Sequence, residues 1–422
     1  SAMKDENGVR GAVLLRPGVF SCSGVIVVKS GGVVLRGSGS GEGGTVIKMT
    51  GRPHVCVSVR GAGSPEPEGK GVKITNKYIA SGSDSISVED ASGFRVGETI
   101  FVIRPVTEGW VHFMGMDTLV RDGKKQTWIS GQTRTERRIK VIEGKTLVLD
   151  IGLSDSFDVK YLDPPGATVV HGSEGGRISQ VGLEGFRISA PGESVTINVP
   201  LYRAFSMDHV VDGWARDIAI ENTHNSVGIG GGTMRITVED VKITHDVATQ
   251  GAAKPADFSG GGTQLLFSRC TVKGDNLFYF ITGPRISGPI VVKDCVFRGD
   301  GHVQPHARWA TGLLVENCQV PEGGIDFMNR GEMGSGHGWT VGWGVAWNCS
   351  AKGSIVQNPP GCVNWAIGCS WERVKRARPF DKEPVLAEGI YDSHGVKVVP
   401  GSLYLAQLRE RLKEKTEKGI GY

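Results

Sequence analysis

Short runs of alternating apolar and polar residues recur along most of the chain, each bounded by glycine or by a polar residue. Alternation with a period of two is typical of β-strands with one buried face, and the glycines between the runs predict tight turns. Five runs in the C-terminal half contain a cysteine, which follows a polar residue in the first four and a glycine in the last: QLLFSRCTV, PIVVKDCVF, LLVENCQV, WGVAWNCSA and VNWAIGCSW. These cysteines are Cys270, Cys295, Cys318, Cys349 and Cys369.

The same template continues toward the N-terminus without cysteine, in MRITVEDVKI near Val241 and ARDIAIENTHN near Thr223, with a weaker match at GLEGFRISA near Ile188. The spacings from Thr223 to Cys369 are 18, 29, 25, 23, 31 and 20 residues. A strand-containing repeat of about 20–30 residues is typical of a solenoid. The pattern therefore predicts an all-β fold, a right-handed parallel β-helix. Cysteines in one phase of successive coils should stack inside it as reduced thiols, without disulfides or zinc.

Two parts of the chain depart from the repeat. Between residues 76 and 165, long alternating segments with glycine turns predict antiparallel hairpins, and hence a small inserted β subdomain. Near the end, Leu403, Leu405, Leu408 and Leu412 are spaced as on one face of an amphipathic helix. We therefore expect N-terminal coils at 8–75, the insertion at 76–165, the main coils at 166–375, and a tail with a C-terminal helix at 376–422.

Composition limits the classes of partner. The 422 residues carry 48 basic and 44 acidic side chains and a net charge of +4, which argues against a nucleic-acid or membrane-surface partner. No apolar run approaches the roughly 18 residues of a membrane span. The opening SAMK is typical of an expression remnant, so a signal peptide is presumed removed and we expect a secreted or periplasmic protein. Oligomeric state is left open.

Several stretches resemble a known group of proteins. LLRPGVF and VVLRGSG near the N-terminus, and QPHARWATG, NRGEMGSGHGW and NPPGCVNWAIGC later, resemble the pectate-lyase-like superfamily of parallel β-helices, in an uncharacterised bacterial subgroup. The resemblance implies a carbohydrate-active protein. The superfamily includes both polysaccharide lyases and glycoside hydrolases, so it does not select a reaction. The calcium-binding aspartate set of pectate lyases has no match in this sequence.

Three consecutive coils carry extra residues beyond the 20 that separate Cys349 from Cys369. These excursions span 274–288, 299–312 and 322–344 and leave their coils at about the same phase, so we expect them side by side on one flank. Loops on a rigid scaffold are the usual place for function. The candidate site residues that they contribute are Tyr279, Arg285, His302, His306, Arg308, Trp309, Asn329, Arg330, Glu332, His337 and Trp339.

Arginine suits a carboxylate and histidine exchanges protons near neutral pH, so these residue types suit β-elimination on a uronate. The residues expected to be catalytic are His306, Arg308, Arg330, His337 and Tyr279. The residues expected to bind substrate are Trp309, Asn329, Glu332, Trp339, His302 and Arg285. Structural roles stay open for these residues: a solvated loop for His302, a brace for Arg308 or Arg330, and core packing for Tyr279.

The sequence thus predicts a polysaccharide lyase that cleaves a uronic-acid-containing polysaccharide. One alternative is a glycoside hydrolase on the same fold, with its acids among Asp257, Asp326 and Glu332. Another is a glycan-binding β-helix without catalysis. No cofactor or metal site is expected; Ca²⁺ stays open because the sequence shows no clear ligand set for it.

Overall fold

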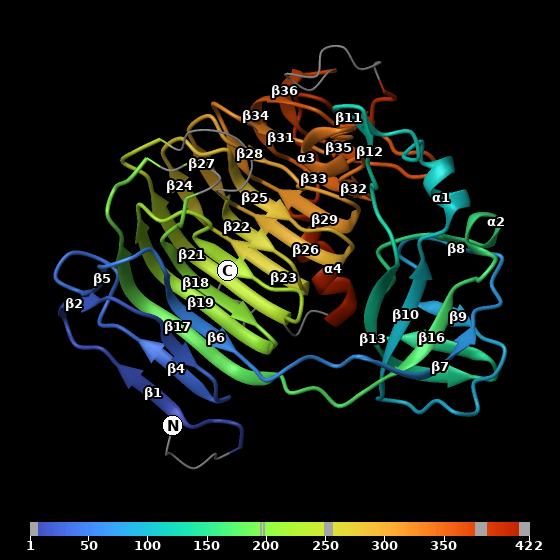
Figure 1. Ribbon diagram of the computed structural model, residues 1–422, viewed down its shortest axis with the longest axis horizontal. Helices are drawn as coiled ribbons and strands as arrows, with labels where there is room; N and C mark the ends of the chain where they lie inside the picture. The colour runs from blue at the N-terminus through green and yellow to red at the C-terminus, as the bar shows by residue number, and fades with distance from the viewer. Residues whose placement is uncertain (1–6, 195, 197–198, 249–255, 376–385, 413–422) are drawn as a thin grey trace.

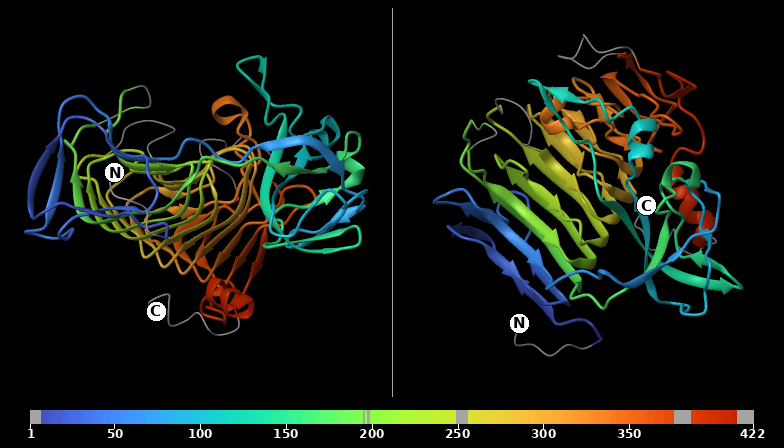
Figure 2. Two further views of the ribbon diagram at one scale, coloured as in Figure 1. Left: turned by 90° about the horizontal axis from the view of Figure 1, so that it is seen from below. Right: turned by 45° about the vertical axis from the view of Figure 1, so that its right-hand side comes forward.

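Parallel strand pairing winds most of the chain into a solenoid, seen from three directions in Figures 1 and 2. The computed structural model describes residues 7–194, 196, 199–248, 256–375 and 386–412. Within the coils each strand pairs in parallel with the strand one coil further on, as Val211 does with Met234 and Leu265 with Ile290. The predicted all-β fold, a parallel β-helix, is confirmed.

The larger sheet contains 19 strands and covers two faces of the solenoid. Its strands are β1 (Gly11–Leu14), β2 (Gly18–Cys22), β4 (Val33–Arg36), β5 (Thr45–Met49), β17 (Ile178–Ser189), β19 (Val210–Glu221), β21 (Met234–Thr244), β23 (Thr263–Ser268), β24 (Thr271–Lys273), β26 (Ile286–Lys293), β27 (Val296–Arg298), β29 (Ala310–Glu316), β30 (Gln319–Val320), β32 (Val341–Gly342), β33 (Val345–Trp347), β34 (Ser350–Ser354), β35 (Trp365–Ile367), β36 (Ser370–Arg373) and β37 (Ile390–Asp392).

A second parallel sheet of eight strands closes the coils. Its strands are β3 (Ile26–Val28), β6 (Val55–Arg60), β18 (Arg203–Asp208), β20 (Val227–Ile229), β22 (Ala256–Gly260), β25 (Phe278–Thr282), β28 (His302–Val303) and β31 (Gly324–Ile325). Side chains from both sheets meet in one continuous apolar core along the solenoid axis.

The larger sheet bends at one residue per coil, and this bend explains the polar residue or glycine before each stacked cysteine. Asp294, Asn317 and Asn348 have φ of 53°, 51° and 53°, the left-handed conformation that Asp and Asn tolerate better than most residues. The next residue turns inward, so Cys295, Cys318 and Cys349 are 0–2% exposed. All eight cysteines are free thiols, as predicted.

The strand register corrects the repeat near the N-terminal end of the main coils. The position equivalent to Cys270 is Val241, as expected, but one coil earlier it is Ile218 and not Thr223. Before that it is Phe186 and not Ile188. Thr223 lies after β19, where it donates a hydrogen bond to Ser226. The repeat was misaligned because the alternation continues past the bend with no cysteine to mark it.

The insertion stands against one flank of the solenoid (Figures 1 and 2). Its main antiparallel sheet runs from β7 to β16, which pair with each other, so it extends beyond the predicted 76–165 on both sides. The strands of this sheet are β7 (Pro67–Lys73), β9 (Ser85–Ser87), β10 (Thr99–Pro105), β13 (Gln132–Glu143), β14 (Thr146–Leu149) and β16 (Thr168–Gly172). The smaller elements are β8 (Tyr78–Ile79) with β15 (Phe157–Asp158), the hairpin β11 (Val120–Arg121) and β12 (Lys124–Lys125), and the helices α1 (Glu108–Phe113) and α2 (Val159–Leu162).

The chain ends with a further coil and a helix. β37 pairs with β35, which carries the solenoid past the predicted limit at residue 375. The expected C-terminal helix is α4 (Leu403–Leu412), and residues 413–422 of the predicted segment lie outside the described part. Buried Glu316 accepts hydrogen bonds from Ser402 Oγ and Tyr404 N at 2.5 and 2.9 Å, which attaches α4 to the outside of the large sheet. In the described part of the chain no helix has the length and apolar character needed to cross a membrane.

Replacing a stacked cysteine by serine should destabilise the solenoid. Cys318→Ser replaces a fully buried thiol, which donates to the carbonyls of Val292 and Glu316, by a more polar hydroxyl. Because burying the hydroxyl costs more, we expect the free energy of unfolding to fall by about 1–3 kcal/mol. Urea unfolding measures this loss. Cys22→Ser is the matched control, because the partly exposed Cys22 already donates to the carbonyl of Gly24. Equal losses in both variants would show that burial of the stack is not the cause.

Candidate active site

A histidine and an aspartate from successive coils are paired on the outer side of the eight-stranded sheet. His302 lies on β28, and Asp326 directly follows β31 on the next coil. His302 Nδ1 is 2.7 Å from Asp326 Oδ2, which also accepts a hydrogen bond from Gln304 Nε2 at 2.7 Å. Asp326 Oδ1 accepts from the backbone N–H of Ile355 at 3.0 Å. The carboxylate is therefore held rigidly, and it orients the imidazole so that Nε2 is the nitrogen available for proton exchange.

The pair sets the protonation of His302. Burial lowers the pKa of His302, but the Asp326 charge and hydrogen bond outweigh burial, and the pKa lies above its ordinary value. The side chain is 39% exposed while that of Asp326 is 3% exposed. His302 thus combines an oriented ring with access to solvent, two requirements of a general acid or base.

A second cluster adjoins this pair through Phe278, whose backbone lies opposite His302 in the sheet. The His306 ring meets Phe278 edge to face, and the guanidinium of Arg330 lies 5.5 Å from the Phe278 centroid. Arg330 Nη1 donates to His306 Nδ1 at 3.1 Å and to the His306 carbonyl at 2.8 Å. The ring of His337 is 4.7 Å from that of His306. The structure therefore brings together His306, Arg330 and His337, three of the residues expected to be catalytic.

The contact with Arg330 fixes the state of His306. Arginine only donates hydrogen bonds, so His306 Nδ1 must accept, and the ring is neutral with its proton on Nε2. His306 is therefore a donor at Nε2, whereas His302 can accept there. The two histidines differ in role because one is held by a carboxylate and the other by a guanidinium.

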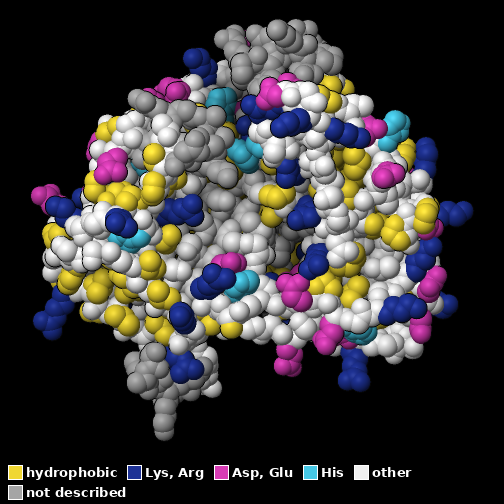
Figure 3. Space-filling model, in the orientation of Figure 1, with side chains coloured by type: hydrophobic (Ala, Val, Ile, Leu, Met, Phe, Trp, Pro, Cys, Tyr) yellow, Lys and Arg dark blue, Asp and Glu magenta, His cyan; other side chains and the backbone are white. Residues whose placement is uncertain are grey.

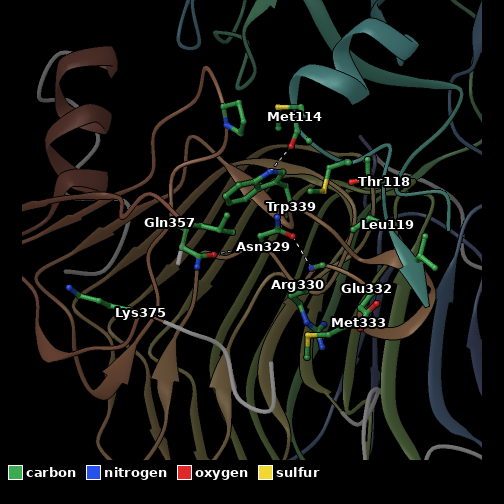
Figure 4. Close-up of a pocket in the computed structure, with 16 residues that line it drawn as sticks. Met114, Thr118, Leu119, Asn329, Arg330, Glu332, Met333, Trp339, Gln357 and Lys375 are labelled. Carbon is green, nitrogen blue, oxygen red and sulfur yellow. Dashed lines mark hydrogen bonds between the residues drawn. The ribbon is translucent and has the colours of Figure 1, made fainter. Parts of the chain in front are cut away.

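Arg330 also lines a pocket of about 520 Å³, here called the arginine pocket, between the solenoid and the insertion. Figure 4 shows Trp339 at its centre, with Gln357 and Lys375 on one side and Thr118 and Leu119 of the insertion on the other. Figure 3 shows the corresponding face of the molecule hollowed between the solenoid and the insertion, with Lys and Arg side chains on both sides. Both apolar and polar side chains line the pocket, which suits a ligand that carries hydroxyls on a hydrocarbon ring.

The charge of the arginine pocket is positive. Arg330 and Lys375 face a single carboxylate, Glu332, among the described residues that line it. Arg330 is 6% exposed, burial lowers its pKa to about 10, and its Nε has no hydrogen-bond partner in the described part of the chain. A buried cationic donor without a partner is costly, and an anionic ligand would supply the missing acceptor.

The structure corrects the roles of two tryptophans. Trp309 and Trp339 are 2% and 3% exposed and belong to an apolar cluster shared with the insertion. Trp309 Nε1 donates to Asp155 Oδ2 at 2.8 Å, and Trp339 Nε1 donates to the carbonyl of Met114 at 3.0 Å. They anchor the insertion to the solenoid, so neither offers an open ring face to a sugar, although Trp339 still forms part of a pocket wall.

Three further residues lie away from the predicted chemistry. Arg308 Nη2 donates to the Ser335 carbonyl and hydroxyl at 2.7 and 2.6 Å, which braces the short helix α3 (Met333–Gly336). Arg285 Nη1 donates to the carbonyl of Ser130 in the insertion. Tyr279 is fully buried, stacks on Phe297 and donates to the Gly274 carbonyl, and burial raises its pKa well above its ordinary value. Tyr279 is therefore a core residue and not a catalytic acid.

The remaining predicted residues line the arginine pocket. Asn329 accepts from the Gly331 N–H through Oδ1 and donates its backbone N–H to Gln357, and Glu332 borders α3. Of the predicted hydrolase acids, Asp257 is fully buried against His245 and Asp326 is held by three donors. Glu332 thus has no second acid from that set beside it.

Sequence reasoning did not identify several residues of the site. Phe278, Gln304, Gln357 and the role of Asp326 as the partner of His302 were missed. One available signal was the spacing of 24 residues between His302 and Asp326, close to one coil, which places them side by side. The pocket wall from Met114 to Val120 had no such signal, because it belongs to the insertion.

No group of three or more His, Cys, Asp or Glu side chains in the described ranges is arranged to hold a metal ion.

No family model matches the chain, and no curated protein sequence matches it. Among solved structures, the chain is similar to the tailspike protein gp49 from Pseudomonas phage LKA1, with a TM-score of 0.39 and 12% identity over 85% of this chain and 54% of that one.

Two other structures are similar at comparable levels. The Gp54 tailspike of Acinetobacter baumannii bacteriophage AP22, solved with a capsular saccharide, has a TM-score of 0.42 and 10% identity over 91% of this chain and 64% of that one. The A-module of the Azotobacter vinelandii mannuronan C-5 epimerase AlgE6 has a TM-score of 0.31 and 10% identity over 92% and 91%. The chain thus spans 54% and 64% of the two tailspikes, and the resemblance to the pectate-lyase-like superfamily stays a prediction.

The titration of His302 should depend on Asp326. Because its folded pKa is raised, the charged ring stabilises the fold below its unfolded pKa of about 6.5, and this contribution is lost as pH rises through the folded pKa. In NMR titrations we expect the pKa of His302 to fall in Asp326→Asn. Glu332→Gln is the control and should leave it unchanged. A wild-type pKa of His302 below about 6.5 would show that Asp326 does not outweigh burial.

Proposed function

We propose that the protein is a polysaccharide lyase that cleaves a uronic-acid-containing glycan by β-elimination. The observation that carries the proposal is the buried guanidinium of Arg330, which borders the arginine pocket and contacts His306, while its Nε has no partner in the described part of the chain. A uronate carboxylate placed there would accept the missing hydrogen bond. Neutralising that carboxylate acidifies the proton on C5 of the sugar.

The two histidines would divide the proton transfers between them. His302, oriented by Asp326, takes the C5 proton at Nε2, and the resulting carbanion is delocalised into the carboxylate beside Arg330. The C4–O4 bond then breaks, its electron pair leaves with O4, and the C4–C5 double bond forms. His306 donates its Nε2 proton to the departing oxygen. His337 lies against His306 and positions that ring.

The acid content of the pocket favours elimination over hydrolysis. Glycoside hydrolases of the usual kind need two carboxyl groups about 5–10 Å apart. Glu332 is the single carboxylate among the described residues that line the arginine pocket. Elimination requires no such pair, because a cation and a base perform the chemistry.

Loss of His302 should remove activity. On a panel of acidic polysaccharides, the wild type should generate unsaturated uronates, detected by ultraviolet absorbance, and His302→Gln should reduce kcat by about 10²–10⁴-fold. The control is His112→Gln, since that side chain is 81% exposed on the insertion. New reducing ends without ultraviolet absorbance, lost in Glu332→Gln but retained in His302→Gln, would establish hydrolysis instead.

Replacing Arg330 by lysine tests whether its fork of hydrogen-bond donors matters in addition to its positive charge. Arg330→Lys keeps the positive charge but loses the fork of donors, and we expect kcat/KM to fall about 10- to 100-fold, the equivalent of one charge-assisted hydrogen bond. Arg308→Lys is the matched control, since Arg308 braces α3 from outside the arginine pocket. If kcat/KM fell equally in the two variants, Arg330 would have a structural role like that of Arg308.

A further inference from the structure

A smaller cavity of about 150 Å³, here called the junction cavity, adjoins the arginine pocket, since Met114 and Pro360 line both. Its walls come from the insertion and from the solenoid. Trp110, Phe113 and Tyr161 of the insertion contribute aromatic rings, with Phe113 and Tyr161 stacked at a centroid distance of 4.0 Å. Trp309 and Cys362 close it from the solenoid side. The cavity therefore combines aromatic rings with polar groups, since Arg104, Asp155 and Asp158 also line it.

Among the described residues that line this cavity, one is a cation. Arg104 is 4% exposed, with its guanidinium 4.0 Å from the centre of the Trp110 ring. Its Nε donates to the Ser156 carbonyl at 3.3 Å and lies 3.6 Å from Asp155 Oδ2. Its Nη1 has no hydrogen-bond partner within the described ranges. An orphan donor in such a place requires an acceptor that the protein does not provide.

The charge around Arg104 argues against an anionic acceptor. The described residues that line the cavity include one cation, Arg104, and two carboxylates, Asp155 and Asp158. Lys160 lies over the outer Tyr161 ring and is not part of the lining. Asp155 already compensates the guanidinium, so a further negative charge would meet net repulsion. The arginine pocket has the opposite balance, with Arg330 and Lys375 against Glu332.

We propose that the junction cavity binds the acetamido group of an N-acetylhexosamine unit in the same glycan. Its carbonyl oxygen accepts from Arg104 Nη1, its methyl group packs against the aromatic rings, and its N–H faces Asp158. An acetamido group is a neutral acceptor with an apolar end, which is the combination that these walls select. The proposal rests on the proposed function for the identity of the polymer: a uronate in the arginine pocket beside an N-acetylhexosamine in the junction cavity.

Isosteric probes test the cavity directly. Acetamide and acetate have the same shape and differ in charge, so saturation-transfer NMR on each methyl signal distinguishes a neutral from an anionic site. We expect transfer to acetamide, and displacement of acetamide by N-acetylglucosamine or N-acetylgalactosamine, whereas acetate and glucose neither bind nor displace. Transfer to acetate in preference to acetamide would overturn the proposal, and so would an absence of transfer to both.

Variants place the signal in the cavity. Ser156→Leu fills it, and Tyr78→Ala removes an exposed part of its wall without disturbing the core. Each should raise the dissociation constant of acetamide by about tenfold or more, because Ser156→Leu occupies the space of the ligand and Tyr78→Ala removes a packing contact. The control is Val159→Leu, an exposed position that does not line the cavity. If neither cavity variant weakens binding while both retain the wild-type melting temperature, the probe binds elsewhere and the proposal is wrong.

The outcome is independent of the lyase reaction, because the probes carry no scissile bond and need no turnover. Suppose that the polysaccharide assay shows hydrolysis or no activity while the methyl signal still depends on Ser156 and Tyr78. That result would contradict the proposed reaction and support the acetamido site. Elimination without that signal would do the reverse.

Discussion

The left-handed bend in each coil is the constraint on which the rest of the structure depends. Asp294, Asn317 and Asn348 occupy the same point of three successive coils, and the residue after each turns inward into the core. Because the bend fixes where a coil turns, it also fixes the phase at which the next coil begins. The excursions leave the solenoid at matching positions for that reason, and His302 comes to lie beside Asp326.

The junction with the insertion determines what the excursions can do. Trp309 and Trp339 are large apolar side chains on exposed-looking loops, and the insertion buries both. In doing so it encloses space that neither part would enclose alone, since the arginine pocket and the junction cavity each take walls from both. Burial then removes water from Arg330 and Arg104. Arginine is usually exposed to solvent, and here Arg330 Nε and Arg104 Nη1 are left without a hydrogen-bond partner among the described residues.

The two enclosed spaces differ in charge and therefore in the chemical group that each can accept. Arg330 lies in a pocket with excess positive charge, whereas Arg104 is compensated by Asp155 and faces Asp158. A carboxylate suits the first and a neutral carbonyl the second. Since the spaces share Met114 and Pro360, neighbouring groups of one extended ligand could occupy both.

The sequence by itself determined the repeat, and with it the parallel β-helix, the buried thiol stack and the flank on which His306, Arg330 and His337 meet. A strand period of two and a polar residue or glycine before each stacked cysteine are local signals, so they can be recognised without knowledge of the fold. The C-terminal helix was equally local. The register near Thr223 was misjudged because no cysteine marks the bend there, and Ile218 takes the position instead.

Only the tertiary structure decided the roles of individual side chains. Tyr279, Trp309 and Arg308 are residue types common in active sites, but each has a structural role here. Tyr279 is buried in the core, Trp309 packs against the insertion, and Arg308 braces α3. His302 appeared to be a loop residue until Asp326 from the next coil oriented its ring. The pocket walls from residues 114–120 come from about 200 residues earlier in the chain. Such contacts depend on how the insertion packs against the coils, and this packing leaves no periodic signal in a sequence.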